Sequence, residues 1–221
     1  MADLKNMMSW LWPQVLFVSK GKETPVLEIA IENGKKVLNA GTVNYSFGSL
    51  HDVFRVALQK ANVETQQPDK ILILGFGAGS VATILLEEMK LQPSVITGVE
   101  ADEVVIRIGK EEFDTERFQN LQLIHDRAER FVAADSGSYD LIAVDLFVED
   151  QVPEACQSEE FLRNLSRQLS PEGLLVFNTM PVENLSGESV FFKRFMSVFP
   201  NGRMQEIRTG EAKNFVFIAR K

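Results

Sequence analysis

The sequence predicts a doubly wound α/β domain with a mostly parallel sheet, preceded by a small β-hairpin region and closed by an antiparallel hairpin. Short apolar runs alternate with helical patterns along most of the chain, and a glycine-rich turn follows the first run in this array. The last two runs have no helix between them. Such alternation is typical of a parallel sheet that helices cover on both faces.

The composition is that of one ordinary globular protein. The chain has 221 residues, 45% of them hydrophobic and 24% charged, so a sizeable core is possible within one larger domain. The formal net charge of −8 disfavours a nucleic-acid partner, since affinity for phosphates depends on lysine and arginine. The single cysteine, Cys156, excludes an internal disulfide and is typical of a reducing compartment, so we expect a cytoplasmic protein.

Residues 1–47 are expected to form the small N-terminal β region. The segment 25–41, PVLEIAIENGKKVLNAG, contains two short strand patterns around an Asn-Gly pair, which favours a tight hairpin turn. The stretch Met7–Val18 is apolar and aromatic, but Pro13 interrupts it and it is too short to cross a bilayer. We expect it to pack on the core or on a partner subunit, with no membrane association.

The main domain, 48–221, is expected to start with a helix over 49–61 and then to alternate strands and helices. The alternating strands are expected at Ile71–Leu74, Ser94–Val99, Leu121–Ile124, Leu141–Val144 and Gly173–Asn178. The helices between and after them are expected at Ser80–Lys90, Glu103–Glu111, Ala128–Ala134, Glu159–Leu169 and Glu188–Val198. The final strands, Met204–Arg208 and Phe215–Ala219, are joined without a helix and must pair as an antiparallel hairpin.

The turn after the first strand of the main domain is the first candidate site. In ILILGFGAGS (71–80) the apolar run leads into Gly75, Phe76, Gly77, Ala78 and Gly79. Glycines let the backbone turn sharply and leave its amides open to a ligand, while the following helix directs its positive end to the same place. In a Rossmann-like sheet, ligands bind at the carboxyl ends of the strands. We therefore expect these five residues to hold a cofactor.

An acidic residue ends the next expected strand. Glu100 closes this strand in GVEAD, and Ala101 follows it. A carboxylate at this place characteristically accepts hydrogen bonds from ribose hydroxyls. Together with the glycine turn, Glu100 predicts a bound adenosine-type nucleoside.

The glycine pattern favours S-adenosylmethionine or a relative over a dinucleotide. The third glycine of the dinucleotide pattern G-x-G-x-x-G would fall at Ser80. The Tyr-x-x-x-Lys motif of short-chain reductases is missing, since Ala143 follows Tyr139 and Ser49 follows Tyr45 at that spacing. No His, Asp and Glu residues have metal-site spacing, so we expect no metal.

Six segments carry a resemblance to a known family. They are VLNAG (37–41), ILILGFGAGS (71–80), VITGVEAD (95–102), HDRAERFV (125–132), YDLIAVD (139–145) and EEFLRNLSRQLSPEGLLVFN (159–178). With them the chain resembles the spermidine synthase family and its relatives within the class I methyltransferase fold. The resemblance implies a homodimer and the transfer of an alkyl group from a sulfonium donor to a small-molecule nucleophile, such as an amine.

The resemblance also implies roles for particular residues. Glu100 stands where the family has its ribose-binding acid, and Asp145 stands where the family has the base that deprotonates the attacking amine. The acid that contacts adenine is displaced in this chain, because its place holds Arg127, between Asp126 and Ala128.

Two carboxylates of the family are replaced. Ala78 stands where an aspartate pairs with the donor's amino group, and Val148 stands where a second aspartate holds the polyamine. Burying ammonium groups without carboxylate partners is costly, whereas the carboxylate of intact S-adenosylmethionine would be repelled by an aspartate at position 78. We therefore expect a diverged methyltransferase that uses S-adenosylmethionine.

Alternatives stay open at this point. A true aminopropyltransferase, a spermidine synthase, would use decarboxylated S-adenosylmethionine, and a non-catalytic relative would bind the nucleoside without turnover. Asp145 is either a general base or an acid that caps the following loop. Tyr45 and His51 lie in the segment expected to cover the pocket and are candidates for contact with the acceptor, but the interpretation favoured for His51 is a partly exposed helix residue.

Overall fold

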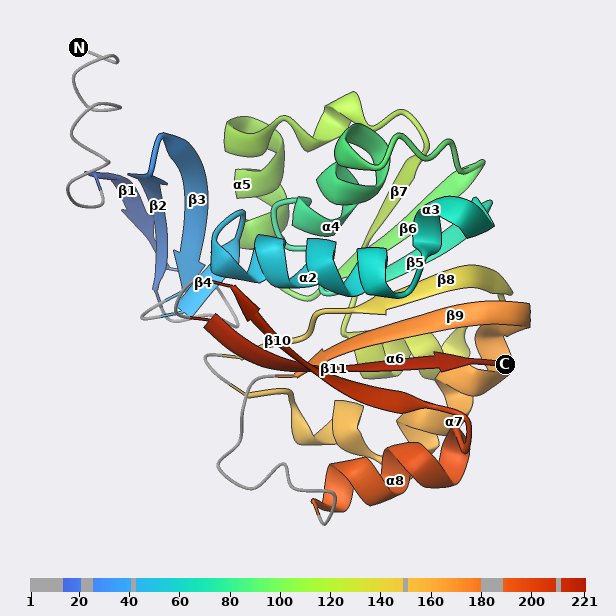
Figure 1. The fold of residues 1–221 in the computed structure, drawn as a ribbon. Helices are drawn as coiled ribbons and strands as arrows, with labels where there is room; N and C mark the ends of the chain where they lie inside the picture. The colour runs from blue at the N-terminus through green and yellow to red at the C-terminus, as the bar shows by residue number, and fades with distance from the viewer. Residues whose placement is uncertain (1–13, 21–25, 41–42, 149–150, 180–188, 210–211) are drawn as a thin grey trace.

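The protein folds as two sheets, the larger one covered by helices on both faces. The computed structural model describes residues 14–20, 26–40, 43–148, 151–179, 189–209 and 212–221. Within this part of the chain, a four-stranded antiparallel sheet stands beside a seven-stranded sheet (Figure 1). No helix of the described residues is long and apolar enough to span a membrane.

The seven-stranded sheet has the order β10-β11-β9-β8-β5-β6-β7. Its strands are β5 (Lys70–Leu74), β6 (Val95–Glu100), β7 (Leu121–His125), β8 (Tyr139–Val144), β9 (Leu169–Thr179), β10 (Arg203–Thr209) and β11 (Ala212–Arg220). The five strands from β9 to β7 run parallel, whereas β11 is antiparallel to both β9 and β10. The predicted mostly parallel sheet with an antiparallel C-terminal hairpin is therefore confirmed. The order reverses at β5, which places the topological switch point between β5 and β8.

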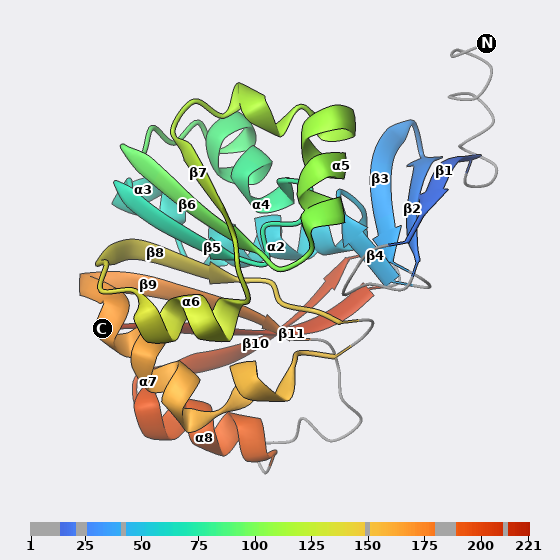
Figure 2. The ribbon, with the colours of Figure 1, turned by 180° about the vertical axis from the view of Figure 1, so that it is seen from behind.

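Helices cover the two faces of this sheet (Figures 1 and 2). One face carries α2 (Ser49–Lys60), α3 (Val63–Gln66), α4 (Ser80–Thr83) and α5 (Glu103–Phe113), and the other carries α6 (Ala128–Ala134), α7 (Glu159–Gln168) and α8 (Val190–Val198). Alternate residues of β5 serve both cores: Ile71 and Ile73 pack toward α2, and Leu72 and Leu74 pack toward α7. Burial on both faces explains why the strand reads as a continuous apolar run.

The predicted helix over 80–90 is not a regular α-helix. It is α-helical over Ser80–Thr83 and π-helical over Ile84–Glu88, where the Met89 N–H donates to the Ile84 carbonyl at 2.8 Å. Sequence patterns do not separate the two, because Ile84 and Leu85 are buried in either case. A π-helical turn is uncommon and often lies at a functional site.

The small sheet consists of β1 (Gln14–Ser19), β2 (Leu27–Glu32), β3 (Lys35–Ala40) and β4 (Val43–Ser46). The predicted hairpin is confirmed, since Asn33 and Gly34 connect β2 to β3 with φ of 49° and 75°. The sequence did not reveal β1 and β4. The proposed boundary at residue 47 falls in the connection from β4 to α2, and a separate N-terminal domain stays a prediction.

Candidate functional site

A pocket lies at the carboxyl ends of β5, β6, β7 and β8, beside the switch point. The empty space within the pocket, open solvent included, is about 570 Å³. Among its lining residues are seven that sequence reasoning proposed: Gly75, Glu100, Ala101, Asp126, Arg127, Ala128 and Asp145. Topology brings them together, because each follows or ends a strand of the parallel array.

The rest of the glycine turn does not line this pocket. The Phe76 side chain is 2% exposed and packs against Gly98, where a Cβ atom would lie 2.5 Å from the ring. Ala78 is buried among apolar side chains of the small sheet and α5, and Gly79 faces Phe118. A contact of these residues with a cofactor stays a prediction.

Position 75 requires glycine because the backbone at the end of the neighbouring strand β8 comes very close to it. Gly75 has φ of +82°, and a Cβ atom there would lie 2.2 Å from the Asp145 carbonyl oxygen. The Asp145 N–H in turn donates to the Leu74 carbonyl at 2.8 Å. The turn therefore sets Asp145 at the pocket wall.

Glu100 holds the glycine turn in place. Its buried carboxylate accepts hydrogen bonds from the Gly77 N–H at 2.9 Å and from the Asp102 N–H at 3.0 Å. Burial raises the pKa of Glu100 above its ordinary value, although the bonds from Asp102 and Gly77 oppose this shift. Glu100 lines the pocket, and its hydrogen bonds with a ribose stay a prediction.

Asp145 lies at the pocket wall with a raised pKa. The carboxylate lies partly enclosed at the pocket wall, and desolvation raises its pKa to about 7, while a hydrogen bond from Asn178 Nδ2 at 3.0 Å opposes the shift. A base is most effective when its pKa lies near the working pH. Asn178 was not predicted from the sequence as a site residue. It ends the predicted strand 173–178, and because ligands bind at the carboxyl ends of parallel strands, its position could have indicated it.

The remaining lining residues contribute acidity and an apolar wall. Glu129 and Cys156 lie on the α6 side, and the Cys156 thiol has its pKa raised to about 12 by burial and by Glu129. Such a thiol is not a nucleophile near neutral pH. Within the described residues, no three His, Cys, Asp or Glu side chains are grouped so as to hold a metal ion.

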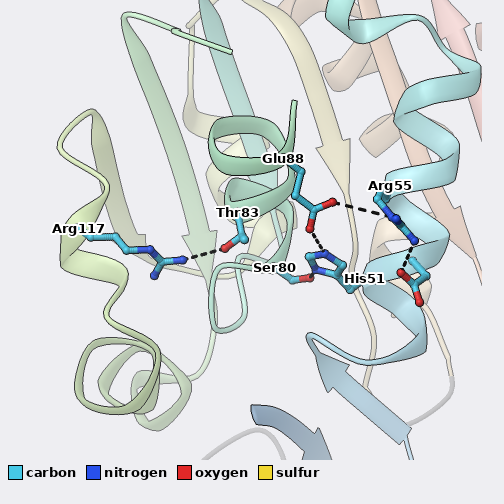
Figure 3. Close-up of polar contacts among 7 residues, drawn as sticks. His51, Arg55, Ser80, Thr83, Glu88 and Arg117 are labelled. Carbon is cyan, nitrogen blue, oxygen red and sulfur yellow. Dashed lines mark hydrogen bonds and ion pairs between the residues drawn. The ribbon is translucent and has the colours of Figure 1, made fainter. Parts of the chain in front are cut away.

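His51 lies outside the pocket and is not the partly exposed residue of the alternative interpretation. It is 8% exposed, with Nδ1 2.7 Å from Ser80 Oγ and Nε2 2.7 Å from Glu88 Oε1 (Figure 3). The π-helical turn carries Glu88, and Arg55 approaches the other oxygen of Glu88 at 3.9 Å. Tyr45 belongs to β4, but its side chain lies outside the described residues.

The fold and the pocket define the class of this protein, a class I methyltransferase-like α/β domain with an acidic site at its switch point. The family model described as the spermine/spermidine synthase domain matches residues 54–202, which is most of the chain. The chain therefore belongs to this family, and the predicted resemblance is confirmed.

Curated relatives carry the name polyamine aminopropyltransferase. The protein from Vibrio vulnificus is 32% identical over 146 residues, which cover 63% of this chain and 48% of the relative. The protein from Chromobacterium violaceum is 30% identical over 156 residues, which cover 69% of this chain and 57% of the relative. The chain thus spans about half the length of the curated relatives it matches.

Solved structures share the fold at low sequence identity. A probable spermidine synthase from Corynebacterium glutamicum has a TM-score of 0.76 and 22% identity. The match covers 92% of this chain and 79% of that structure. A spermidine synthase in complex with the transition state analogue AdoDATO has a TM-score of 0.74 and 16% identity, with coverages of 94% and 74%. Human methyltransferase-like protein 13 in complex with SAH has a TM-score of 0.63 and 19% identity. The match covers 78% of this chain and 82% of that structure.

Proposed function

We propose that this protein transfers an aminopropyl group from decarboxylated S-adenosylmethionine to a small-molecule amine, with Asp145 as the general base. The observation that carries the proposal is the position of Asp145 in the pocket, with a pKa of about 7, beside the acid that ends β6. The names of the curated relatives support this alternative over the diverged methyltransferase that we expected from the sequence.

The position of Ala78 removes one argument for the methyltransferase. A carboxylate at position 78 could select between the donors only if that side chain faced the donor, but the Ala78 side chain is fully buried with apolar residues of β2, β3 and α5. Its lack of a carboxylate therefore favours neither donor. Val148 does line the pocket and is 45% exposed, so the replacement of the family's second aspartate by valine does affect the pocket.

The lining residues suit cationic reactants. Acids from four segments, Glu100, Asp126, Glu129 and Asp145, meet one arginine, Arg127, in the pocket wall. A cleft whose charged residues are mostly acids concentrates cations, and both a sulfonium donor and an amine acceptor are cationic near neutral pH. Glu100 would hold the ribose of the donor, and the segment 126–128 would flank its adenine ring.

The chemical step assigned to Asp145 is a proton transfer. Asp145 takes a proton from the ammonium group of the acceptor, which frees the nitrogen lone pair. The nitrogen attacks the carbon next to the sulfonium, a C–N bond forms, and the C–S bond breaks with its electron pair going to sulfur. The products are an alkylated amine and a neutral thioether nucleoside, and the proton leaves Asp145 for solvent. A positioned base contributes about 10²–10⁴ in rate.

The test is turnover with each donor. The purified chain is incubated with putrescine and either donor, and products are identified by mass spectrometry. We expect spermidine and methylthioadenosine from the decarboxylated donor, and a rate of formation lower by about 10²-fold or more in Asp145→Asn. A methylated product from intact S-adenosylmethionine alone would restore the diverged methyltransferase. Binding of either donor without turnover would indicate a non-catalytic relative.

We also propose a homodimer that forms through β1. This strand is an edge of the small sheet, and it exposes four consecutive apolar residues, Val15, Leu16, Phe17 and Val18. An exposed apolar edge strand is a ready surface for pairing with another chain. A cytoplasmic location, and the lack of nucleic-acid and membrane partners, stay predictions from the composition.

A further inference from the structure

A chain of three polar side chains crosses from the pocket to the antiparallel part of the main sheet. Asn178 Nδ2 donates to Asp145 Oδ1 at 3.0 Å, and Asn178 Oδ1 accepts from Asn214 Nδ2, also at 3.0 Å. Asp145 follows β8, Asn178 lies in β9 and Asn214 lies in β11. The two asparagines are 0% and 2% exposed, so water does not compete for these bonds.

The chemistry of Asp145 sets the direction of this chain. An ionised carboxylate can only accept hydrogen bonds, so Asn178 must turn its NH₂ group to Asp145 and its carbonyl to Asn214. Asn214 must then present its NH₂ group. Both amide dipoles therefore point their positive ends toward the carboxylate, and each bond strengthens the next in a medium of low dielectric constant.

We propose that Asn178 and Asn214 are positioning residues for Asp145, which orient its carboxylate and stabilise the charged form that accepts a proton. Neither asparagine is among the residues that line the pocket, so both act through Asp145. With Oδ1 held by Asn178, Oδ2 is the oxygen that receives the proton of the acceptor amine. The catalytic meaning of this inference rests on the proposed function, but the effect on the charge of Asp145 does not.

Other ionisable groups also face Asp145 across the pocket. They come from the end of β6, the end of β7, α6 and the short helix over 154–157, and are Glu100, Asp126, Arg127, Glu129 and Cys156. The pKa of Asp145 is nevertheless governed first by desolvation, which raises it, and then by the bond from Asn178, which lowers it. Removal of the Asn178 amide therefore raises the pKa of Asp145 further.

The first experiment uses stability and requires no turnover. Asp145 has a folded-state pKa of about 7, above its unfolded value of about 3.9, so its stabilising contribution is complete at low pH and is lost as the pH rises through 7. The difference in stability between the protein and its Asp145→Asn variant, measured by urea denaturation over pH, reports this loss. The folded-state pKa of Asp145 that fits this pH profile is called the stability midpoint below. In the Asn178→Leu background we expect this midpoint to move up by about one pH unit or more.

Matched variants separate this effect from general damage to the sheet. Asn214→Leu should move the midpoint in the same direction by a smaller amount, because it acts through Asn178. Thr179→Val is the control, since Thr179 is 5% exposed and donates to the Phe215 carbonyl at 2.8 Å between the same two strands. This variant should lose stability without moving the midpoint. If Asn178→Leu does not fold, Asn178→Ser replaces it, because a serine hydroxyl is too short to make the bond to Asp145.

The second experiment is the pH profile of kcat/KM with the decarboxylated donor and putrescine. The acidic limb should move up in Asn178→Leu, so that activity lost at neutral pH returns at higher pH, and the limb should not move in Thr179→Val. An unchanged stability midpoint in both asparagine variants overturns the positioning role. If wild type shows no turnover with any donor, the proposed function fails, whereas the stability titration still decides the role of Asn178.

Discussion

At the residue scale, the acid that ends β6 serves the fold as well as the pocket. Sequence reasoning assigned Glu100 to ribose, and the structure shows that its carboxylate also accepts from the N–H groups of Gly77 and Asp102. Asp102 in turn caps α5, because its side chain accepts from the Val104 N–H. The glycine turn and the start of α5 are thus tied to one buried carboxylate.

This double role makes Glu100→Gln informative. The new NH₂ group would face a backbone N–H, so one buried donor is left without an acceptor at a cost of about 1–3 kcal/mol. We expect a lower free energy of unfolding by urea and at least tenfold weaker binding of methylthioadenosine by calorimetry. The control is Glu129→Gln, which changes an acid of the same pocket that does not bind the turn. Unchanged affinity in Glu100→Gln would show that the ribose lies elsewhere.

Asp145→Asn separates a base from a loop cap. Since the folded-state pKa of Asp145 is raised to about 7, the charged carboxylate destabilises the fold above that pH, and an amide removes this cost. We therefore expect thermal stability at pH 8 to be unchanged or raised, no gain at pH 4, and transferase activity lower by about 10²-fold or more. A large loss of stability at both pH values would identify Asp145 as the cap of the alternative interpretation.

The strand-end rule explains which of these residues the sequence could reveal. Glu100 and Asp145 follow apolar runs, so their place at one edge of the sheet was predictable before any contact was known. Asn214 was not, because its bond to Asn178 depends on the register between β9 and β11. The pKa of Asp145 was also out of reach, since desolvation depends on what encloses the side chain.

At the scale of elements, the glycine turn and the helix after it are held from three directions. Ser46 at the end of β4 accepts from the Ala78 N–H at 3.3 Å, and His51 in α2 contacts Ser80 at 2.7 Å. Glu100 holds Gly77 from β6. Helical periodicity located α2 and α4 but could not show these contacts, nor the π-helical turn that brings Glu88 to His51.

His51→Ala tests this support. It leaves Ser80 without its bond to the ring and Glu88 without its buried partner, so we expect a loss of about 1–3 kcal/mol in urea denaturation. Methylthioadenosine should also bind more weakly, because the helix after the glycine turn loses a contact. Asp52→Asn is the control on the same helix, since its ion pair with Arg55 is about 40% exposed and worth about 0–1 kcal/mol. Equal losses in both variants would mean that His51 adds no more than a surface pair does.

At the scale of the whole molecule, periodicity predicted which segments of the main domain form strands and helices, but it did not predict the order of the strands in the sheet. The array from β5 to β11 was predictable because each element has a clear apolar pattern and an alternating partner. The small sheet was predicted only as a hairpin, since β4 is short and β1 lacks the alternation of a half-buried strand. Strand β1 lacks alternation because its middle four residues are all exposed.

The exposure of β1 leads to a prediction about assembly. Val15, Phe17 and Val18 are 50–55% exposed on an edge strand, and burying such side chains in a second copy would remove apolar surface from water at about 25 cal/mol per Å². We expect a homodimer in light scattering after size exclusion, and Phe17→Lys should convert it to a monomer with the main domain still folded by circular dichroism. Val190→Lys is the matched control, because Val190 is 63% exposed on α8, on the far side of the main sheet. A wild-type monomer would refute the dimer, and a dimer that survives Phe17→Lys but not Val190→Lys would move the interface from β1 to α8.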